Sequence, residues 1–193
     1  MKNKAHDVTG YNFSSGELVL PDANIWLFLY SPATMALPGW RQAQIAPYSS
    51  AWSDLHTNGA KACLDPLVMC EVVNRLLDEE WARIDPRDAT GKRKYASRKK
   101  FRKSSDYPAA AKAVETYSRL ILADAQSLDH PFTKWDLDAM LAEFGSSSTD
   151  WNDQMIVENC RIHGCMLLTD DADHTEGGIQ VITANPNLVA ACP

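Results

Sequence analysis

Apolar residues fall into short runs separated by polar turns, and the first clear run is near the amino terminus. The apolar run over residues 17–20 stops at Pro21 and Asp22, and the segment that follows continues to Tyr30 as NIWLFLY. Short apolar runs bounded by turn residues are typical of buried strands, whereas longer runs favour helices. We therefore predict a buried strand, a turn and a helix in this order.

Helical signals dominate the middle of the chain. Asp65, followed by proline, supplies an amino-terminal cap, and the apolar period after it predicts a helix that reaches about Ile84. Pro108 opens a second helix, which we expect to run to about Leu128. A shorter helix is predicted over residues 135–144.

Three stretches lack a clear period. Residues 1–15 are expected to form an amino-terminal extension. Residues 31–60 contain several prolines and glycines, so we predict a loop with one short helix near residues 50–57. Residues 86–107 are flanked by Asp, Gly, Ser and Pro and are predicted to be a mobile insertion or a frayed helical hairpin.

The carboxyl-terminal part alternates helix and strand. DWNDQMIVENCRIH predicts a helix closed by Gly164, and CMLLT and IQVIT predict short buried strands. Strands that alternate with helices imply an α/β fold, with a mostly parallel central sheet covered on both faces in three α/β/α layers. The chain has 193 residues, enough for one such domain and too few for two comfortable ones, so we expect residues 1–193 to form a single domain.

The composition is that of a globular protein, with 45% apolar and 23% charged residues. The longest apolar stretch, residues 18–30, is interrupted by polar residues and is shorter than the roughly 20 residues that a membrane span needs. The amino terminus shows no apolar stretch of the kind that a secretory signal requires, so we expect a cytoplasmic protein without a membrane segment. The five cysteines lack any CxxC pair or zinc-type spacing, which favours reduced, buried thiols.

Charge is distributed unevenly along the chain. Residues 92–103 (KRKYASRKKFRK) contain eight basic side chains and no acid, whereas the remainder holds 11 basic and 25 acidic side chains, a balance of −14. Because Lys and Arg neutralise phosphates, and Tyr95 and Phe101 could stack on unpaired bases, we predict that this segment contacts RNA. The alternatives are a solvated loop and a docking surface for an acidic partner. The predicted RNA-binding residues are Lys92, Arg93, Lys94, Arg98, Lys99, Lys100, Arg102 and Lys103.

Carboxylates gather where the predicted strands end. Asp22 follows the first strand, and residues 170–173 (DDAD) follow CMLLT. In an open parallel sheet, ligands bind beyond the carboxyl ends of the strands, so both acidic groups are expected to face one site. Asp150 and Asp153 lie three residues apart at the start of a helix and share a face, although acids there also simply suit the helix dipole.

Glu71 interrupts the apolar face of the helix that begins after Asp65 (PLVMCEVV). A charge in such a place needs a partner, a metal ion or neutralisation, and Arg75, four residues on, is the alternative to a metal. Carboxylates that converge on one crevice repel one another unless cations share the site. All-oxygen ligation favours Mg²⁺ or Mn²⁺, and one or two such ions can activate water for phosphodiester cleavage.

Taken in order, these segments resemble the PIN domain. The resemblance is carried by PDANIWL, MCEVVNRLL, TDWNDQMIVENCRIHGCMLLTDDADH and IQVIT, and it is greatest to the PIN-domain ribonucleases that include the VapC-like toxins of bacterial toxin–antitoxin pairs. It implies a PIN-like fold and Mg²⁺- or Mn²⁺-dependent hydrolysis of RNA. It also implies an antitoxin protein as partner and a homodimer.

The resemblance assigns roles to individual residues. The implied metal-binding and catalytic acids are Asp22, Glu71, Asp153 and Asp171, with Asp150 and Asp173 as auxiliary acids and Asn24 and Thr169 as orienting residues. The sequence departs from the family pattern at His174, where the family often has an aromatic residue. Three alternatives stay open at this point: a toxin or an RNA-processing enzyme, a different acid of each cluster as ligand, and a catalytically weak scaffold that binds nucleic acid or a protein through the basic segment.

Overall fold

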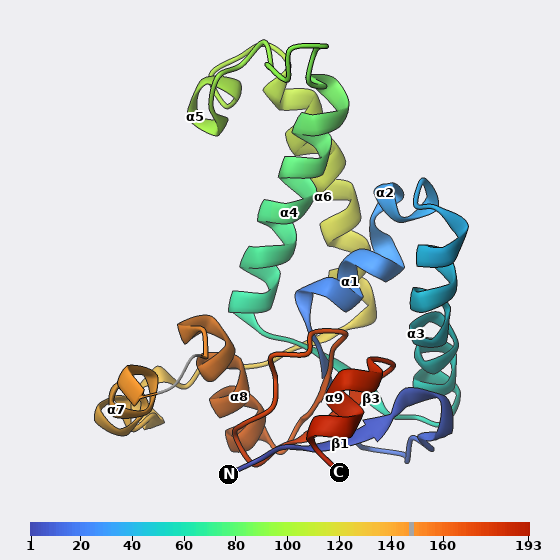
Figure 1. The fold of residues 1–193 in the computed structure, drawn as a ribbon, viewed down its shortest axis with the longest axis vertical. Coiled ribbons are helices and arrows are strands. Elements are labelled where there is room, and N and C mark those ends of the chain that lie inside the picture. Colours follow the sequence, from blue (N-terminus) through green and yellow to red (C-terminus); the bar gives the residue numbers. More distant parts are fainter. Residues whose placement is uncertain (147–148) are drawn as a thin grey trace.

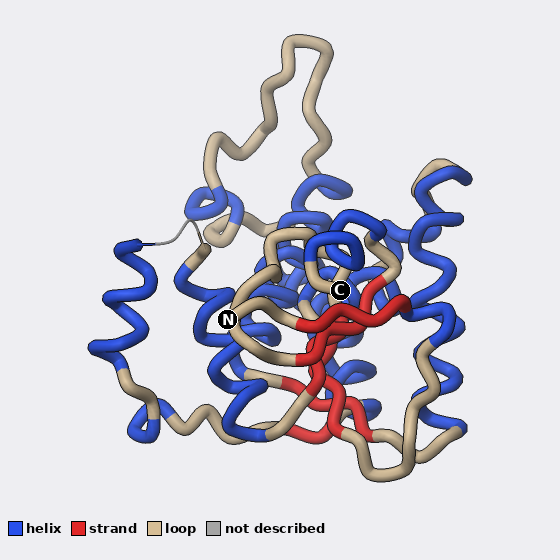
Figure 2. Tube along the Cα trace, turned by 60° about the horizontal axis from the view of Figure 1, so that its bottom comes forward, coloured by secondary structure: helices blue, strands red, loops and turns tan. Residues whose placement is uncertain are grey.

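The computed structural model, which describes residues 1–146 and 149–193, has a central sheet in which neighbouring strands pair in parallel. In spatial order the strands are β1 (Lys4–Asp7), β6 (Gln180–Thr183), β5 (Met166–Leu168), β2 (Leu18–Pro21), β3 (Lys61–Leu64) and β4 (Gln126–Ser127). Helices lie on both sides of the strands (Figure 2). The predicted α/β class with a parallel central sheet is thereby confirmed.

The helices carry the connections between strands (Figure 1). They are α1 (Ala23–Tyr30), α2 (Pro32–Met35), α3 (Gly39–Thr57), α4 (Pro66–Ile84), α5 (Arg98–Phe101), α6 (Tyr107–Asp124), α7 (Leu137–Ser146), α8 (Trp151–His163) and α9 (Pro186–Ala191), with 3₁₀ turns at Val8–Gly10 and Phe132–Lys134. The predicted α4 is confirmed, with Asp65 accepting the Leu67 amide as its cap, and Gly164 ends α8 with a φ of 65°. In the described part of the chain, no helix is both long and apolar enough to cross a bilayer.

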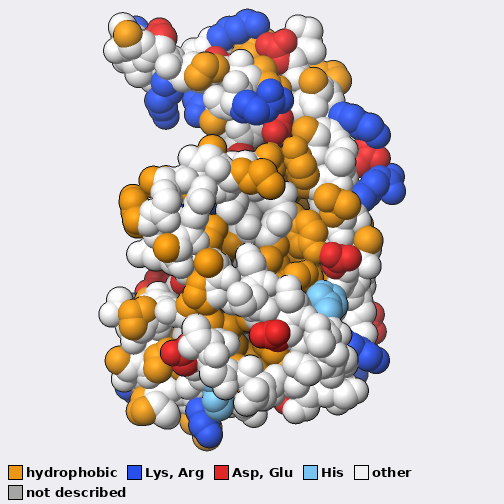
Figure 3. Space-filling view, turned by 90° about the vertical axis from the view of Figure 1, so that its right-hand side faces the viewer, with side chains coloured by type: hydrophobic (Ala, Val, Ile, Leu, Met, Phe, Trp, Pro, Cys, Tyr) orange, Lys and Arg blue, Asp and Glu red, His pale blue; other side chains and the backbone are white. Residues whose placement is uncertain are grey.

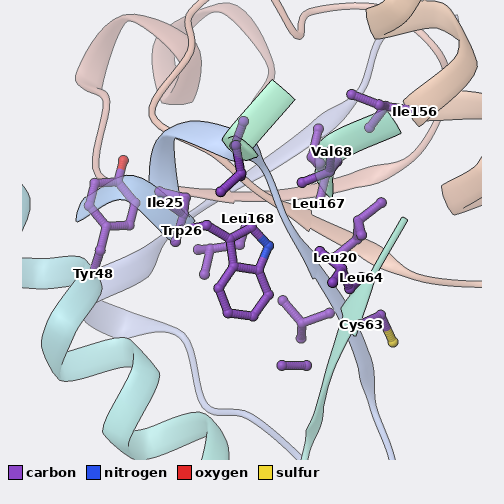
Figure 4. Packing of buried hydrophobic residues seen from close by; sticks show 14 of the residues in the cluster. Leu20, Ile25, Trp26, Tyr48, Cys63, Leu64, Val68, Ile156, Leu167 and Leu168 are labelled. Atoms are coloured by element: carbon purple, nitrogen blue, oxygen red, sulfur yellow. The ribbon is translucent and has the colours of Figure 1, made fainter. Parts of the chain in front are cut away.

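The central strands are buried on both faces, as their continuous apolar runs require. Leu20 and Leu167 have no exposed surface, and Trp26 of α1 is equally buried beside them. Side chains from the strands meet those of α1, α4 and α8 in one cluster (Figure 4). This cluster fixes the ends of β2 and β5, where the candidate acids lie.

The prediction of a loop with one short helix near residues 50–57 was right only about that helix, because most of residues 31–60 forms the 19-residue helix α3. Pro47 lies inside the helix and cannot donate a backbone hydrogen bond, which normally argues against a helical interior. The helix is stabilised instead by its buried face, which includes Ile45, Tyr48 and Leu55 at helical spacing. Packing against the rest of the fold therefore outweighs the destabilising effect of Pro47 on the helix.

The predicted extension over residues 1–15 is part of the domain. Residues Lys4–Asp7 form the edge strand β1, which pairs in parallel with β6. The side chain of Asn3 accepts the Ile179 amide at 3.0 Å, and Phe13 is buried in the main core. An edge strand buries little of its surface and therefore needs few apolar residues. For this reason Lys4–Asp7 is too short and too polar to be recognised as a strand from the sequence.

The basic insertion, expected as a mobile or frayed segment, is folded at the far end of α4 and α6 (Figures 1 and 2). Its organising residue is Phe101, which has no exposed surface and packs against the rings of Trp81, Tyr95 and Tyr107. Arg98 in α5 pairs with Asp78 of α4. The insertion is thus held by an aromatic cluster around Phe101, which joins the main core through the long helices.

Candidate active site

Asp22 lies at the carboxyl end of β2, where it begins α1. The residue is 7% exposed, and one carboxylate oxygen accepts the Ala23 amide at 2.6 Å. The other oxygen accepts Asn24 Nδ2 at 2.6 Å and Thr169 Oγ1 at 2.8 Å. Three donors from two neighbouring strand ends therefore fix the orientation of this carboxylate.

Asn24 and Thr169 also hold the loop that follows β5. Thr169 Oγ1 accepts the Asp171 amide at 3.0 Å, and Asn24 Oδ1 accepts the Asp170 amide at 3.2 Å. The two side chains contact each other, with Asn24 Nδ2 3.1 Å from Thr169 Oγ1. Both residues thus touch Asp22 and the loop, as an orienting role requires.

The three acids after β5 are engaged differently. The Asp170 carboxylate accepts the Tyr48 hydroxyl at 2.7 Å, and its carbonyl accepts Asn185 Nδ2 at 2.8 Å, so this residue is anchored against α3 and the start of α9. Asp171 is exposed and accepts the Asp173 amide through one carboxylate oxygen at 2.9 Å. This arrangement favours Asp171 over Asp170 as the acid that can bind a ligand.

The two acids at the start of α8 also differ. Asp150 is exposed and caps the helix by accepting a backbone amide of the first turn at 2.8 Å. Asp153 is half-buried, and burial raises its pKa above the usual range. A nearby histidine, His174, lowers that pKa, whereas the charges of Asp150, Asp22 and Asp171 raise it further. Asp153 is therefore the acid of this pair that faces the other carboxylates.

Glu71 was expected to be a buried charge on α4, but the residue is exposed. The expected ion pair with Arg75 is not among the salt bridges of the described residues. Partial burial of the carboxyl still raises the pKa of Glu71, and the negative charge of Asp22 has the second largest effect in the same direction. Arg75 lowers this pKa at longer range, and Asp153 and Asp171 raise it. The negative charges of Asp22, Asp153 and Asp171 therefore make ionisation of Glu71 less favourable.

His174 is a site residue to which sequence reasoning assigned no role. It is 3% exposed, and its Nε2 lies 3.9 Å from Asp22 Oδ2 and 3.8 Å from Asp153 Oδ1. Asn3 Nδ2 holds its backbone carbonyl at 3.0 Å, which links the position to the edge strand. The signal in the sequence was the departure from the family pattern directly after the acidic run. No sequence signal pointed to Tyr48 or Asn3 as supports of the site.

The donor set agrees with a hard divalent cation in its chemistry. All four acids offer oxygen ligands, and the charges of Asp22 and Asp171 raise the pKa of Glu71 and Asp153, which is the repulsion that a cation relieves. Within residues 1–146 and 149–193, however, no three His, Cys, Asp or Glu side chains are close enough to enclose an ion.

Two hollows open beside the acids, on either side of α4. The α1 hollow has a volume of about 660 Å³ and includes Asn24 and Asp171 together with apolar side chains of α1. The α8 hollow has a volume of about 540 Å³ and includes Glu71 and Asp153. Arg75 lines both hollows, and Arg98 of the insertion lines the second. An anionic substrate would therefore meet guanidinium groups next to the carboxylates.

The predicted RNA-binding cations form two groups. Arg93 lies over Trp81, Lys94 pairs with Asp106, and Arg98 pairs with Asp78, so these three are used within the insertion. The other five, namely Lys92, Lys99, Lys100, Arg102 and Lys103, are exposed, and the described contacts show no side-chain partner for them. Figure 3 shows basic side chains concentrated at the upper end of the molecule, around the insertion.

Comparison with known proteins identifies a structural relative but no family by sequence. No protein-family model matches the chain, and no curated protein matches its sequence. Among solved structures, a chain in the crystal structure of VapBC2 from Rickettsia felis, bound to a DNA fragment from their promoter, superposes with a TM-score of 0.52 at 11% identity. The match covers 86% of this chain and 98% of that chain. The likeness shows that the protein has a PIN-like α/β fold.

Proposed function

We propose that this protein is a Mg²⁺- or Mn²⁺-dependent endoribonuclease. The observation that carries the proposal is the electrostatic interaction among Asp22, Glu71, Asp153 and Asp171, which come from four separate parts of the fold. Their charges raise the pKa of Glu71 and Asp153. Such mutual repulsion is costly for a purely structural site and useful for one that binds a divalent cation.

The residues of the chain have distinct parts in this proposal. Asp22, held by Asn24 and Thr169, is the best-oriented ligand, and Asp153, Asp171 and Glu71 complete an open acidic surface. Asp150 and Asp173 are auxiliary acids. A bound cation supplies an activated water and charge stabilisation for phosphodiester cleavage. Arg75, between the two hollows, is placed to orient a substrate phosphate.

The test is cleavage of single-stranded RNA with Mn²⁺, with EDTA, and with the Asp22→Asn variant. We expect cleavage to be lost in EDTA and reduced at least about a hundredfold in the variant, since changes to the mere supports of metal ligands cost 10- to 100-fold. Asp54→Asn, which changes an exposed acid of α3 outside the acidic site, is the matched control and should retain most activity. Cleavage that persists in EDTA would contradict the metal requirement, and an undiminished Asp22→Asn enzyme would remove Asp22 from the mechanism.

A second candidate function is a catalytically weak scaffold that binds nucleic acid or a protein partner through its basic insertion. The absence of a closed three-ligand cluster among the described residues and the unpaired exposed cations favour it. Calorimetric titration with Mn²⁺ separates the two functions. No heat of binding, together with RNA binding that depends on residues 92–103, would favour the scaffold.

The structural relative also suggests partners. It is described as VapBC2 bound to promoter DNA, so we include an antitoxin-like protein and a toxin role in the proposal, with a homodimer as the expected state. Light scattering of the purified chain tests the dimer. Co-purification with the product of an adjacent small gene tests the antitoxin, and RNA cleavage in the absence of any such gene would favour an RNA-processing enzyme.

A further inference from the structure

A third hollow lies on the insertion itself, away from the acids. It has a volume of about 580 Å³, and we call it the insertion hollow. Its lining residues are Asp78, Trp81, Arg87, Gly91, Lys92, Arg93, Tyr95 and Ala96. Three of these are cations, whereas Asp78 is the single acid in the lining and already pairs with Arg98. The hollow is therefore electropositive.

The floor of the insertion hollow is a stack of planar groups. Phe101 is fully buried, and the ring of Trp81 lies on it with centroids 5.6 Å apart and planes inclined by 13°. The Arg93 guanidinium carbon lies 4.8 Å from the centre of the Trp81 ring, and Arg93 Nη1 donates to the Asp85 carbonyl at 3.0 Å. Arg93 is thus held in place by an aromatic ring and a carbonyl and lies in no salt bridge of the described residues.

Two further cations border this stack. Arg87 Nη1 donates to the Gly91 carbonyl at 2.7 Å, which closes the loop and places its charge at the rim. Lys92 is exposed, and the described contacts give its side chain no partner. The fixed guanidinium plane of Arg93 is suited to an unpaired base, because bases stack on arginine planes as well as on aromatic rings. The neighbouring charges of Arg87 and Lys92 are suited to the phosphate of that nucleotide. An A-form duplex hides its base faces and cannot use such a plane.

We propose that the insertion hollow is an accessory site for one nucleotide of single-stranded RNA, with the base on Arg93 and the phosphate at Arg87 and Lys92. This inference rests on the proposed ribonuclease function and adds a second point of contact for the substrate. The accessory site binds the strand and takes no part in bond cleavage. A carboxylate-rich peptide could pair with the cations but has no flat ring to stack on the Arg93 guanidinium, so the hollow suits a nucleotide better.

The position of the hollow relative to the acids supports a continuous path. Asp78 lines all three hollows, so the insertion hollow adjoins both hollows beside the acidic site. Trp81 and Glu71 are ten residues apart on the single helix α4, which corresponds to about 15 Å at 1.5 Å per residue. An RNA strand that is bound both at the insertion hollow and at the acids must span this distance. A dinucleotide therefore cannot use the accessory site and the acids together.

The test measures binding without cleavage, by fluorescence anisotropy of a labelled single-stranded RNA of about 12 nucleotides in EDTA. Arg93→Lys keeps the charge and removes the plane, and we expect it to raise Kd about fivefold or more, the loss typical of one base stack. Lys92→Ala should raise Kd by a smaller factor. Lys112→Ala, an exposed cation on α6 that pairs with Glu115, is the matched control and should leave Kd within about twofold. Thermal melting checks that each variant is folded.

Several outcomes would overturn the proposal. Equal weakening by Arg93→Lys and Lys112→Ala would show nonspecific charge attraction, and an equal effect of Arg93→Lys on duplex RNA would exclude base stacking. Competition by a polyglutamate peptide as effective as by RNA would assign the hollow to an acidic protein. In Mn²⁺, Arg93→Lys should raise KM for the long RNA and leave cleavage of a dinucleotide unchanged. If the unchanged protein binds the RNA in EDTA but does not cleave it in Mn²⁺, the ribonuclease function is refuted and the accessory site is not.

Discussion

The acidic end of the sheet and the basic insertion are built on different principles. The acids come from elements far apart in sequence, and the hydrogen bond between Thr169 and Asp22 joins residues 147 positions apart. In the insertion, the ion pairs are local, with Arg98 and Asp78 only 20 positions apart and Lys94 and Asp106 only 12. The acidic end therefore depends on contacts between distant parts of the chain, whereas the insertion depends mainly on contacts close in sequence.

This difference implies that the insertion can be disrupted while the acidic end stays intact. The largest expected effect is that of Phe101→Ala, which removes the centre of the aromatic cluster. Loss of a fully buried phenylalanine costs about 3–5 kcal/mol where the cavity cannot close. We expect amides of residues 98–107 to lose protection in hydrogen exchange, while those of β2 and β5 keep theirs.

The matched control for this variant is Phe132→Ala, because Phe132 is 50% exposed. It should change the free energy of unfolding by no more than about 0.5–1 kcal/mol. Equal loss of protection at β2 in the Phe101→Ala variant would show that the insertion and the sheet unfold together. The two regions would then form one cooperative unit.

The next effect concerns the support of Asp22. Thr169→Val keeps the shape of the side chain but removes the hydroxyl that donates to Asp22 and accepts the Asp171 amide. Changes to the supports of metal ligands cost about 10- to 100-fold, so RNA cleavage in Mn²⁺ should fall by this factor. Thr169→Ser, which retains the hydroxyl, should stay within a few-fold of the unchanged protein. Equal activity of the Val variant would mean that Asn24 alone orients the acid.

The sequence predicted the acidic end better than its surroundings. Strand ends at Asp22 and Asp170, and the cap at Asp65, follow from short apolar runs and turn chemistry, which are local signals. The edge strand β1, the strands β3 and β4, and the first half of helix α3 were missed, since each is stabilised by distant packing and not by its own pattern. Lys61–Leu64 lacks β-branched residues, and Pro47 conceals α3.

The same reasoning explains the errors at single residues. Glu71 was taken as buried because the sequence around it is apolar, but α4 buries Val68, Val72 and Leu76 on its other side. The insertion was predicted to be mobile or a frayed helical hairpin because its many charges conceal the role of Phe101, which is fully buried. His174 had no assigned role because its contact with Asp22 and Asp153 depends on loop geometry. Sequence patterns thus indicated which acids lie at the strand ends but not which contacts surround them.

The smallest expected effect tests the repulsion at the acidic end. Burial raises the pKa of Asp153 in the folded protein, and the neighbouring acids add to this. A raised folded pKa gives stability below the ordinary carboxyl pKa of about 3.9, and this stability is lost as the pH rises through the folded value. At neutral pH the metal-free protein therefore carries a penalty, and Asp153→Asn should raise its Tm by roughly 2–4 °C for about 1 kcal/mol.

Asp136→Asn is the matched control for this prediction, because the exposed Asp136 accepts the Ala139 amide at the start of α7 and asparagine caps equally well. Its Tm should not change. Mn²⁺ should raise the Tm of the unchanged protein more than that of Asp153→Asn, and the difference between the metal-free proteins should vanish below about pH 4. A lower Tm for metal-free Asp153→Asn at neutral pH would mean that attraction to His174 outweighs the burial and repulsion of the acid. In that case attraction would stabilise the acidic end, as the ion pairs of Arg98 and Lys94 stabilise the insertion, and this contrast between the two regions would disappear.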